Sequence, residues 1–169
     1  KDINEDYKPI PVLDYSRSKV ESEKDLINSN KNFVILRLGS LYGNSLDSTR
    51  LNIMPNLFSK IASFNGKITL YSGGDQLKSL VSVYDVARCM EFVGESEKIN
   101  NEIYNCVNEN LTVKEVADIC KKVNKNLEVI STDDPVPNKG YTLSNEKIKS
   151  IGFKFLYKIE NSIEEMIHA

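Results

Sequence analysis

Tyr15 and Lys19 are the residues of this sequence whose types and spacing point most directly to chemistry. They stand four positions apart in the stretch PVLDYSRSKVESEKDL, residues 11–26, near the start of an expected helix. Residues at that spacing share one helix face, and an ammonium beside a phenol favours the phenolate. Such a pair can take a proton from a hydroxyl, or return one to a carbonyl, while a hydride moves. Chance alone predicts roughly one Tyr-x-x-x-Lys in a chain of this composition, so the surrounding segments decide whether the pair is catalytic.

Helical and strand-like segments alternate along the chain. Asp14 is a candidate N-cap for the first helix and Asp85 for another, and Thr112 precedes Glu115 at the capping-box spacing. The expected helices span 14–28, 50–66, 86–96, 111–124, 144–152 and 159–169, and the expected strands span 32–38, 67–76 (a short strand and a turn), 78–85, 101–108 and 126–132. This alternation predicts the α/β fold class.

Composition and cysteine use exclude several functional classes. The 169 residues are 40% hydrophobic and 27% charged with a net charge of -2, which is typical of one globular domain and argues against nucleic-acid binding. No apolar run reaches the length of a membrane span. Cys89, Cys106 and Cys120 lie in apolar patterns and are expected as buried thiols in a reducing cytosol. His168 is the only histidine, so neither His-based catalysis nor a metal site is expected.

The glycine-rich turn of nucleotide-binding folds is missing from these residues. Neither G-x-G-x-x-G nor G-x-x-G-x-x-G occurs, and the turns GSLYG at 39–43 and GGD at 73–75 lack the required spacing. The chain alone is therefore not expected to build a dinucleotide site.

Five segments, in order, resemble the extended short-chain dehydrogenase/reductase family, which includes NAD-dependent nucleotide-sugar epimerases and dehydratases. The segments are EDYKPIPVLDYSRSKVESEK, VILRLGSLYGN, ITLYSGGDQLKSLVSVYDVARCM, NEIYNCVNENLTVKEVADI and LSNEKIKSIGFKFLYKIENSIEEMI. The resemblance implies the C-terminal part of a Rossmann-like enzyme with its small α/β substrate-binding subdomain. Residues 1–50 would end the nucleotide-binding fold and carry the Tyr-Lys helix and the following strand, and residues 51–169 would form mainly the substrate-binding subdomain. The N-terminal cofactor-binding half would lie upstream of Lys1, in a chain roughly twice as long.

The resemblance also implies which residues form the catalytic and cofactor site. Tyr15 and Lys19 match the family's catalytic pair, and both would also contact the cofactor. Ser40 stands where the family has an asparagine that faces the nicotinamide and the sugar, and it keeps a hydrogen-bonding group. Tyr42 belongs to the family's Tyr-Gly signature and is included among the substrate-binding residues.

Three further positions are expected at the substrate. Lys78 replaces an arginine that meets the nucleotide diphosphate in the family, which keeps the charge but loses the bidentate fork. Arg50 would approach the substrate from the loop before the helix at 51–64. Tyr141 follows Lys139 in the loop PVPNKGYT, which covers the substrate in the family. Arg37 is expected to pair structurally.

The leading hypothesis is an epimerase or dehydratase of nucleoside-diphosphate sugars that works by hydride transfer. NAD or NADP would bind only together with the missing N-terminal half, so this chain alone is expected to be inactive. A cytoplasmic homodimer without nucleic-acid or membrane partners is expected for the complete protein. One alternative is a sugar-nucleotide reductase resembling dTDP-4-dehydrorhamnose reductase, because the segment DQLKSLVSVYDVA also fits a motif of that family. The other alternative is a non-catalytic remnant that only binds the sugar nucleotide.

Overall fold

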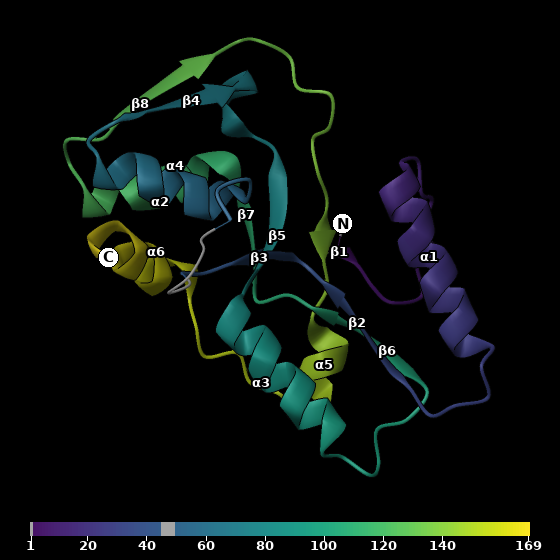
Figure 1. Ribbon diagram of the computed structural model, residues 1–169. Coiled ribbons are helices and arrows are strands. Elements are labelled where there is room, and N and C mark those ends of the chain that lie inside the picture. The colour runs from purple at the N-terminus through teal and green to yellow at the C-terminus, as the bar shows by residue number, and fades with distance from the viewer. Residues whose placement is uncertain (1, 45–49) are drawn as a thin grey trace.

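Parallel strand pairs flanked by helices organise the chain in a computed structural model, which describes residues 2–44 and 50–169 (Figure 1). The strands are β1 (Asp2–Ile3), β2 (Val34–Leu38), β3 (Ser40–Tyr42), β4 (Lys67–Tyr71), β5 (Leu77–Ser82), β6 (Glu102–Cys106), β7 (Glu109–Thr112), β8 (Glu128–Thr132) and β9 (Thr142–Leu143). The helices are α1 (Asp14–Ile27), α2 (Met54–Ser63), the short 3-10 helix η1 (Ser72–Gly74), α3 (Val83–Gly94), α4 (Val113–Val123), α5 (Glu146–Ser150) and α6 (Ile159–His168). The α/β class expected from the sequence is confirmed.

Most strand neighbours are parallel and far apart in the sequence. β2 pairs with β6, β4 with β8, β3 with β5 and β1 with β9, all in parallel, while β7 joins β5 in the antiparallel sense. Parallel pairs need long crossover connections, and helices such as α2, α3 and α4 lie within these connections. The pairing of β3 with β5 matters most for the site, because it places Ser40 opposite Leu80.

Two hydrophobic clusters form the core. The first joins α2, α4 and α6 to β4, and its fully buried members include Ile68, Leu70, Val116, Ala117, Leu127, Ile159 and Ile163. The second joins α3 and α5 to β6, and its buried members include Val81, Val86, Cys89, Tyr104, Cys106, Ile148 and Phe153. Helix α1 contributes no residue to either cluster and has no buried residue of its own.

Local signals predicted one helix start correctly and two incorrectly. The Thr112 side chain accepts the Glu115 N–H at 3.1 Å, while Glu115 accepts the Thr112 N–H at 2.7 Å, so the expected capping box is confirmed. These hydrogen bonds also lower the pKa of Glu115. The expected cap at Asp14 is wrong, because α1 has Leu13 at its N-cap and Asp14 pairs with Arg17 instead.

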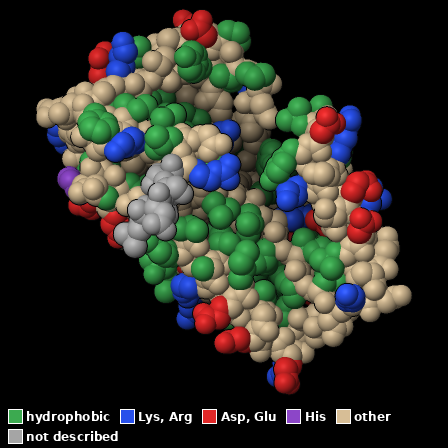
Figure 2. All heavy atoms as spheres, viewed as in Figure 1, with side chains coloured by type: hydrophobic (Ala, Val, Ile, Leu, Met, Phe, Trp, Pro, Cys, Tyr) green, Lys and Arg blue, Asp and Glu red, His purple; other side chains and the backbone are tan. Residues whose placement is uncertain are grey.

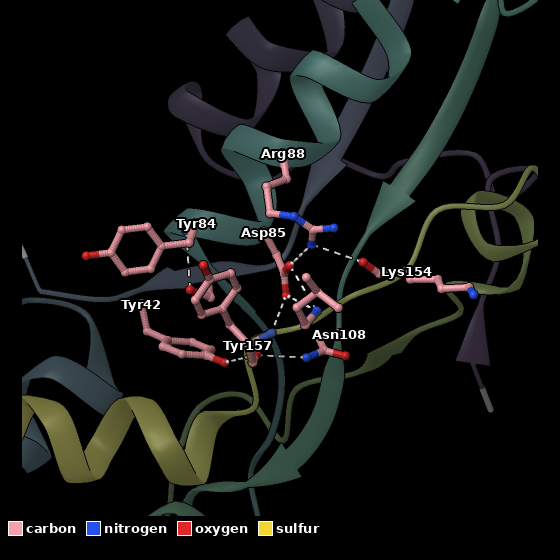
Figure 3. Close-up of polar contacts among 9 residues, drawn as sticks. Tyr42, Tyr84, Asp85, Arg88, Asn108, Lys154 and Tyr157 are labelled. Atoms are coloured by element: carbon pink, nitrogen blue, oxygen red, sulfur yellow. Dashed lines mark hydrogen bonds and ion pairs between the residues drawn. The ribbon is translucent and has the colours of Figure 1, made fainter.

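The expected cap at Asp85 is also wrong. Ser82 occupies the N-cap of α3 and accepts the N–H of Tyr84 at 3.3 Å. Asp85 lies within the first turn, and its side chain is fully buried. The carboxylate accepts the N–H groups of Leu156 and Tyr157 at 3.1 and 3.0 Å, as Figure 3 shows. The carboxylate therefore accepts backbone N–H groups from a segment more than seventy residues away rather than from the start of its own helix.

Neighbouring side chains extend the contacts around Asp85 (Figure 3). Arg88 donates to the Asp85 carboxylate at 2.6 Å and to the carbonyl of Lys154 at 3.0 Å. The carbonyl of Tyr157 accepts the Tyr42 hydroxyl at 3.1 Å and the Asn108 side-chain amide at 3.0 Å. Helix α3, strand β3 and the turn after β6 are thus all fastened to the segment that precedes α6.

Replacing Asp85 by alanine is expected to lower the free energy of unfolding by about 3 kcal/mol, because two backbone N–H groups and a guanidinium lose their buried acceptor. Urea denaturation measures this loss. Asp118→Ala is the matched control, since Asp118 pairs with Lys114 on the surface of α4 at 3.3 Å, and about 0.5 kcal/mol is expected there. Equal losses in the two variants would contradict the role given to Asp85.

Candidate functional site

Tyr15 and Lys19 lie on an open face of α1. The Tyr15 side chain is 73% exposed, and Lys19 is exposed as well. The Lys19 ammonium stands 5.5 Å from the centroid of the Tyr15 ring, within the range of a cation–π contact. The phenol hydroxyl and the ammonium are therefore neighbours on one surface, where both can meet another molecule.

A sizeable cavity lies on another part of the molecule. It is an open groove of about 530 Å³ formed by α2, β4, β5, the start of α4 and the loop 136–138. Its lining residues are Leu57, Phe58, Ile61, Lys67, Ile68, Thr69, Tyr71, Gln76, Lys78, Val113, Val136, Pro137 and Asn138. The walls are mostly apolar, and Lys67 and Lys78 supply the cationic groups. Such a groove suits a flat ring that continues into an anion.

The loop that forms one wall of the groove is fixed to β5. The N–H of Leu77 donates to the carbonyl of Lys139 at 2.8 Å. Gly140 follows with a φ of +78°, and a Cβ there would stand 2.0 Å from the carbonyl oxygen of Leu77. Only glycine fits this close approach. The loop wall is therefore held beside Lys78.

A buried amide supports the far side of the groove. Gln76 is buried, and its side-chain amide donates to the carbonyl of Tyr71 at 2.7 Å. This bond closes the turn between β4 and β5, which contains consecutive positive φ angles at Ser72, Gly73 and Gly74. Tyr71 and Gln76 consequently face the groove from a turn whose backbone is internally braced.

The residues expected at the substrate occupy different positions. Lys78 lines the groove, as the expectation requires for a phosphate contact. Ser40 is exposed on β3 and lies opposite Leu80, two residues along β5 from Lys78. Arg50 is exposed just before α2, and its carbonyl accepts the Asn56 side-chain amide at 3.3 Å. Tyr141 is exposed beside Gly140 and does not line the groove.

Tyr42 has a structural environment. Only 1% of its surface is exposed, and burial raises the pKa of its phenol above the ordinary value. Because the hydroxyl is bonded to the carbonyl of Tyr157 and the ring is covered, no part of the side chain is available to a ligand. We therefore place Tyr42 in the core and leave it out of the proposed site.

The structure does not join the two candidate regions through side-chain contacts. No hydrogen bond or ion pair links Tyr15 or Lys19 to Ser40 or Lys78 within residues 2–44 and 50–169. Helix α1 lies apart from α2 and β4 in Figure 1, and Figure 2 shows a notch in the surface between these parts. Helix α1 and the elements that form the groove thus stand on two sides of this notch.

Sequence reasoning missed most of the groove. Thr69, Tyr71 and Gln76 lie in the segment ITLYSGGDQ, which is expected only to form a strand and a turn. Val136 to Asn138 lie in the loop before Lys139, and nothing in their types indicates a wall. One signal in the sequence could have indicated part of the groove. The strand-turn-strand pattern before Lys78 implies that the strand and the turn at 67–76 lie close to that lysine.

The cysteines have the environment expected from the sequence. Cys89, Cys106 and Cys120 are buried and free. Burial raises the pKa of Cys120 to about 12, and a hydrogen bond that the Cys106 thiol donates to Cys89 is the main cause that raises the pKa of Cys106 and lowers that of Cys89. Among the described residues, no group of His, Cys, Asp and Glu side chains is arranged to hold a metal ion. None of the helices in the described ranges is long and apolar enough to cross a membrane.

Comparisons with known proteins give a consistent family and fold. A sequence model of the NAD dependent epimerase/dehydratase family matches residues 1–106. Anthocyanidin reductase from Arabidopsis thaliana is 31% identical over 165 residues, which cover 90% of this chain and 47% of that protein.

Two solved structures illustrate the likeness of fold. UDP-glucose 4-epimerase from Thermus thermophilus, in complex with NAD, has a TM-score of 0.81 at 20% identity and covers 99% of this chain and 57% of its own. UDP-glucuronic acid 4-epimerase from Bacillus cereus, in complex with UDP-glucuronic acid and NAD, has a TM-score of 0.83 at 19% identity, with 99% and 55% covered. The expected Rossmann-like fold class is confirmed, and the chain spans about half the length of the proteins it matches.

The three thiols are expected to resist alkylation in the folded protein. Their burial keeps the reagent from all three sulfur atoms, and the raised pKa of Cys106 and Cys120 also makes those two thiolates scarce at neutral pH, so modification by iodoacetamide should be about a hundredfold slower than in urea-unfolded protein. Mass spectrometry after timed labelling measures these rates. Rapid labelling of any of the three in the folded state would contradict their placement in the core.

Proposed function

The chain belongs to the NAD dependent epimerase/dehydratase family, and we propose that it supplies the proton-transferring pair and the substrate groove of a nucleotide-sugar epimerase or dehydratase. The observation that carries this proposal is the open face of α1, where Lys19 stands 5.5 Å from the Tyr15 ring. A catalytic acid/base must be accessible to its substrate, and this face presents the exposed Tyr15 side chain with an ammonium beside its ring.

In the proposed reaction, Tyr15 and Lys19 handle the proton. The Tyr15 phenolate takes the proton of a sugar hydroxyl as the carbon that bears it becomes a carbonyl, and the phenol returns the proton in the reverse step. The Lys19 ammonium, 5.5 Å from the centroid of the Tyr15 ring, donates to hydroxyl groups of the sugar beside it. A nicotinamide cofactor, when bound, accepts or supplies the hydride at that carbon.

The residues present fit one side of a cofactor site. Tyr15, Lys19 and Ser40 are exposed polar groups that can meet a ribose and a nicotinamide. The glycine-rich turn that holds a pyrophosphate is absent from these 169 residues. We therefore assign the phosphate-binding side to a part of the protein outside this sequence and only the reacting side to this chain.

The groove is the proposed site of the nucleotide. Its apolar walls, among them Leu57, Ile68 and Val136, suit the flat surface of a base, and Lys78 suits the diphosphate. Lysine gives one compact charge where arginine would give a planar fork. The electrostatic attraction between Lys78 and a phosphate is thus expected to be strong, while the orientation of the phosphate is expected to be less restricted than it would be beside an arginine.

A reductase is the second candidate, and one observation favours it. The chain is 31% identical to anthocyanidin reductase, and the groove is largely apolar, which also suits a non-nucleotide ring. Tyr15 would then deliver a proton to a carbonyl oxygen in a net reduction. Stoichiometric consumption of reduced cofactor separates a reductase from an epimerase, which regenerates its cofactor in each turnover. A protein that binds nucleotide without turnover would be the non-catalytic alternative.

Tyr15→Phe in the complete protein is expected to lower kcat by about a hundredfold or more, because the proton no longer has a carrier. Binding of UDP-glucose, measured by calorimetry, should stay within about twofold, since the phenol hydroxyl acts on the reacting atoms. Tyr104→Phe is the matched control, because Tyr104 is buried in β6 away from the open face. Turnover by Tyr15→Phe at the wild-type rate would refute the catalytic assignment.

Lys78→Met is expected to weaken binding of UDP about tenfold, because a charge-assisted hydrogen bond to phosphate is lost. Titration calorimetry at two salt concentrations measures the effect, and the variant should depend less on salt than the wild type. Lys114→Met provides the control, as Lys114 pairs with Asp118 outside the groove. Unchanged UDP affinity in Lys78→Met would contradict the placement of the diphosphate beside Lys78 in the groove.

A further inference from the structure

Helix α1 packs only loosely against the other elements of the described structure. None of its residues is buried, and the side chains of Ser16, Val20 and Glu23 are its only partly buried ones in the described structure. Glu23 is also the one α1 side chain that makes a hydrogen bond or ion pair with another element among the described residues. The position of the Tyr15 and Lys19 face therefore depends on what Glu23 contacts.

Arg37 of β2 holds Glu23 by both carboxylate oxygens. Its Nε donates to Oε2 at 3.1 Å and its Nη2 donates to Oε1 at 2.5 Å. The two side chains are about one-fifth exposed, at 21% and 19%. A bidentate pair that is largely shielded from water is geometrically strict and less screened than a surface pair.

Arg37 itself is fixed from the other side. Its Nη1 donates to the carbonyl of Glu5 at 2.9 Å. The Glu5 carboxylate accepts the N–H of Asn105 at 2.7 Å, and Asn105 pairs with Arg37 across β2 and β6. The orientation of the Arg37 guanidinium is thus fixed by contacts on the β2 and β6 side as well as by Glu23 of α1.

Glu23 also stands one helical turn after Lys19. At about 100° per residue, the two side chains are separated by about 40° around the helix axis, so they share a face. A carboxylate and an ammonium at this spacing attract each other when neither has another partner. Lys19 instead lies over the Tyr15 ring, and both oxygens of Glu23 are taken by Arg37.

We propose that Arg37 is a positioning residue for the Tyr15 and Lys19 pair. By occupying the Glu23 carboxylate it fixes α1 against β2 and keeps that carboxylate from drawing Lys19 away from Tyr15. The expected effect of Arg37 on turnover rests on the proposed function, whereas its expected effect on the position of α1 does not. The other α1 charges near the pair are already engaged, since Asp14 pairs with Arg17 and Glu21 with Lys24.

The test compares Arg37→Met with the double variant Arg37→Met/Glu23→Gln in the complete protein. In Arg37→Met, amide hydrogen exchange in residues 14–27 should rise about tenfold, because the helix loses its tie. Its kcat should fall about tenfold while KM stays within about twofold, since no groove residue comes from α1 or β2. In the double variant kcat should recover several-fold while exchange stays fast, because the freed carboxylate is gone.

Two further variants keep the result decisive. Lys24→Met removes the partner of Glu21, an exposed pair on the same helix, and should leave exchange and kcat unchanged. Arg37→Lys keeps the charge without the fork, so it should fold even where Arg37→Met does not, with a smaller fall in kcat.

Three results would overturn the proposal: wild-type exchange in residues 14–27 of Arg37→Met, a kcat in the double variant no higher than in Arg37→Met, or a wild-type kcat in Arg37→Lys together with wild-type exchange. Full turnover in Tyr15→Phe would instead refute the proposed function and leave the exchange measurements standing. The two failures are therefore distinguishable.

Discussion

The position of the two hydrophobic clusters relative to each other depends on the hydrogen bonds of one buried group, the Asp85 carboxylate. The chain leaves the cluster beneath α3 near Phe153 and enters the cluster beneath α6 at Ile159. Midway, the N–H groups of Leu156 and Tyr157 find their acceptor in Asp85. Desolvating a carboxylate is unfavourable unless hydrogen bonds replace its water, and here two N–H groups and the Arg88 guanidinium do so. The clusters are consequently joined in one relative orientation.

The two candidate regions differ in how they are attached to this framework. The groove takes its walls from the first cluster, since Phe58 and Ile68 are both core residues and lining residues. Helix α1 belongs to neither cluster in the described structure and is fastened at its side by the Arg37–Glu23 pair. The proposed ligand groove is therefore built into the core, whereas the proposed proton-transferring pair is carried on a helix whose remaining surface is open to further packing.

Sequence patterns predicted what short-range interactions determine. The alternation of periodic segments gave the correct class, and the spacing of Thr112 and Glu115 identified a capping box that the structure contains. The side-chain assignments at Asp14 and Asp85 failed because a carboxylate near a helix start is equally able to bond elsewhere. For Asp85, the deciding partners lie at Leu156 and Tyr157, and no local pattern reveals a contact across that separation.

The candidate site shows the same division. The spacing of Tyr15 and Lys19 was sufficient to place both on one face of α1, because it depends only on helical geometry. The groove was not predictable from spacing, since it needs β4, β5 and the loop 136–138 to meet. Tyr42 illustrates the reverse error, because a motif position next to an expected site became a core residue once β3 packed against the segment that precedes α6.

The close approach of Gly140 to Leu77 has a consequence for how a ligand enters the groove. The loop that forms the wall is hydrogen-bonded to β5 in the chain without a ligand. Its backbone conformational entropy is therefore already lost before a ligand binds. A ligand of the proposed groove would therefore require little ordering of the protein, and its association rate would be governed by diffusion and by the charge of Lys78 rather than by loop closure. Under the proposed function the groove is preformed, and differences in affinity between ligands would arise mainly from their dissociation rates.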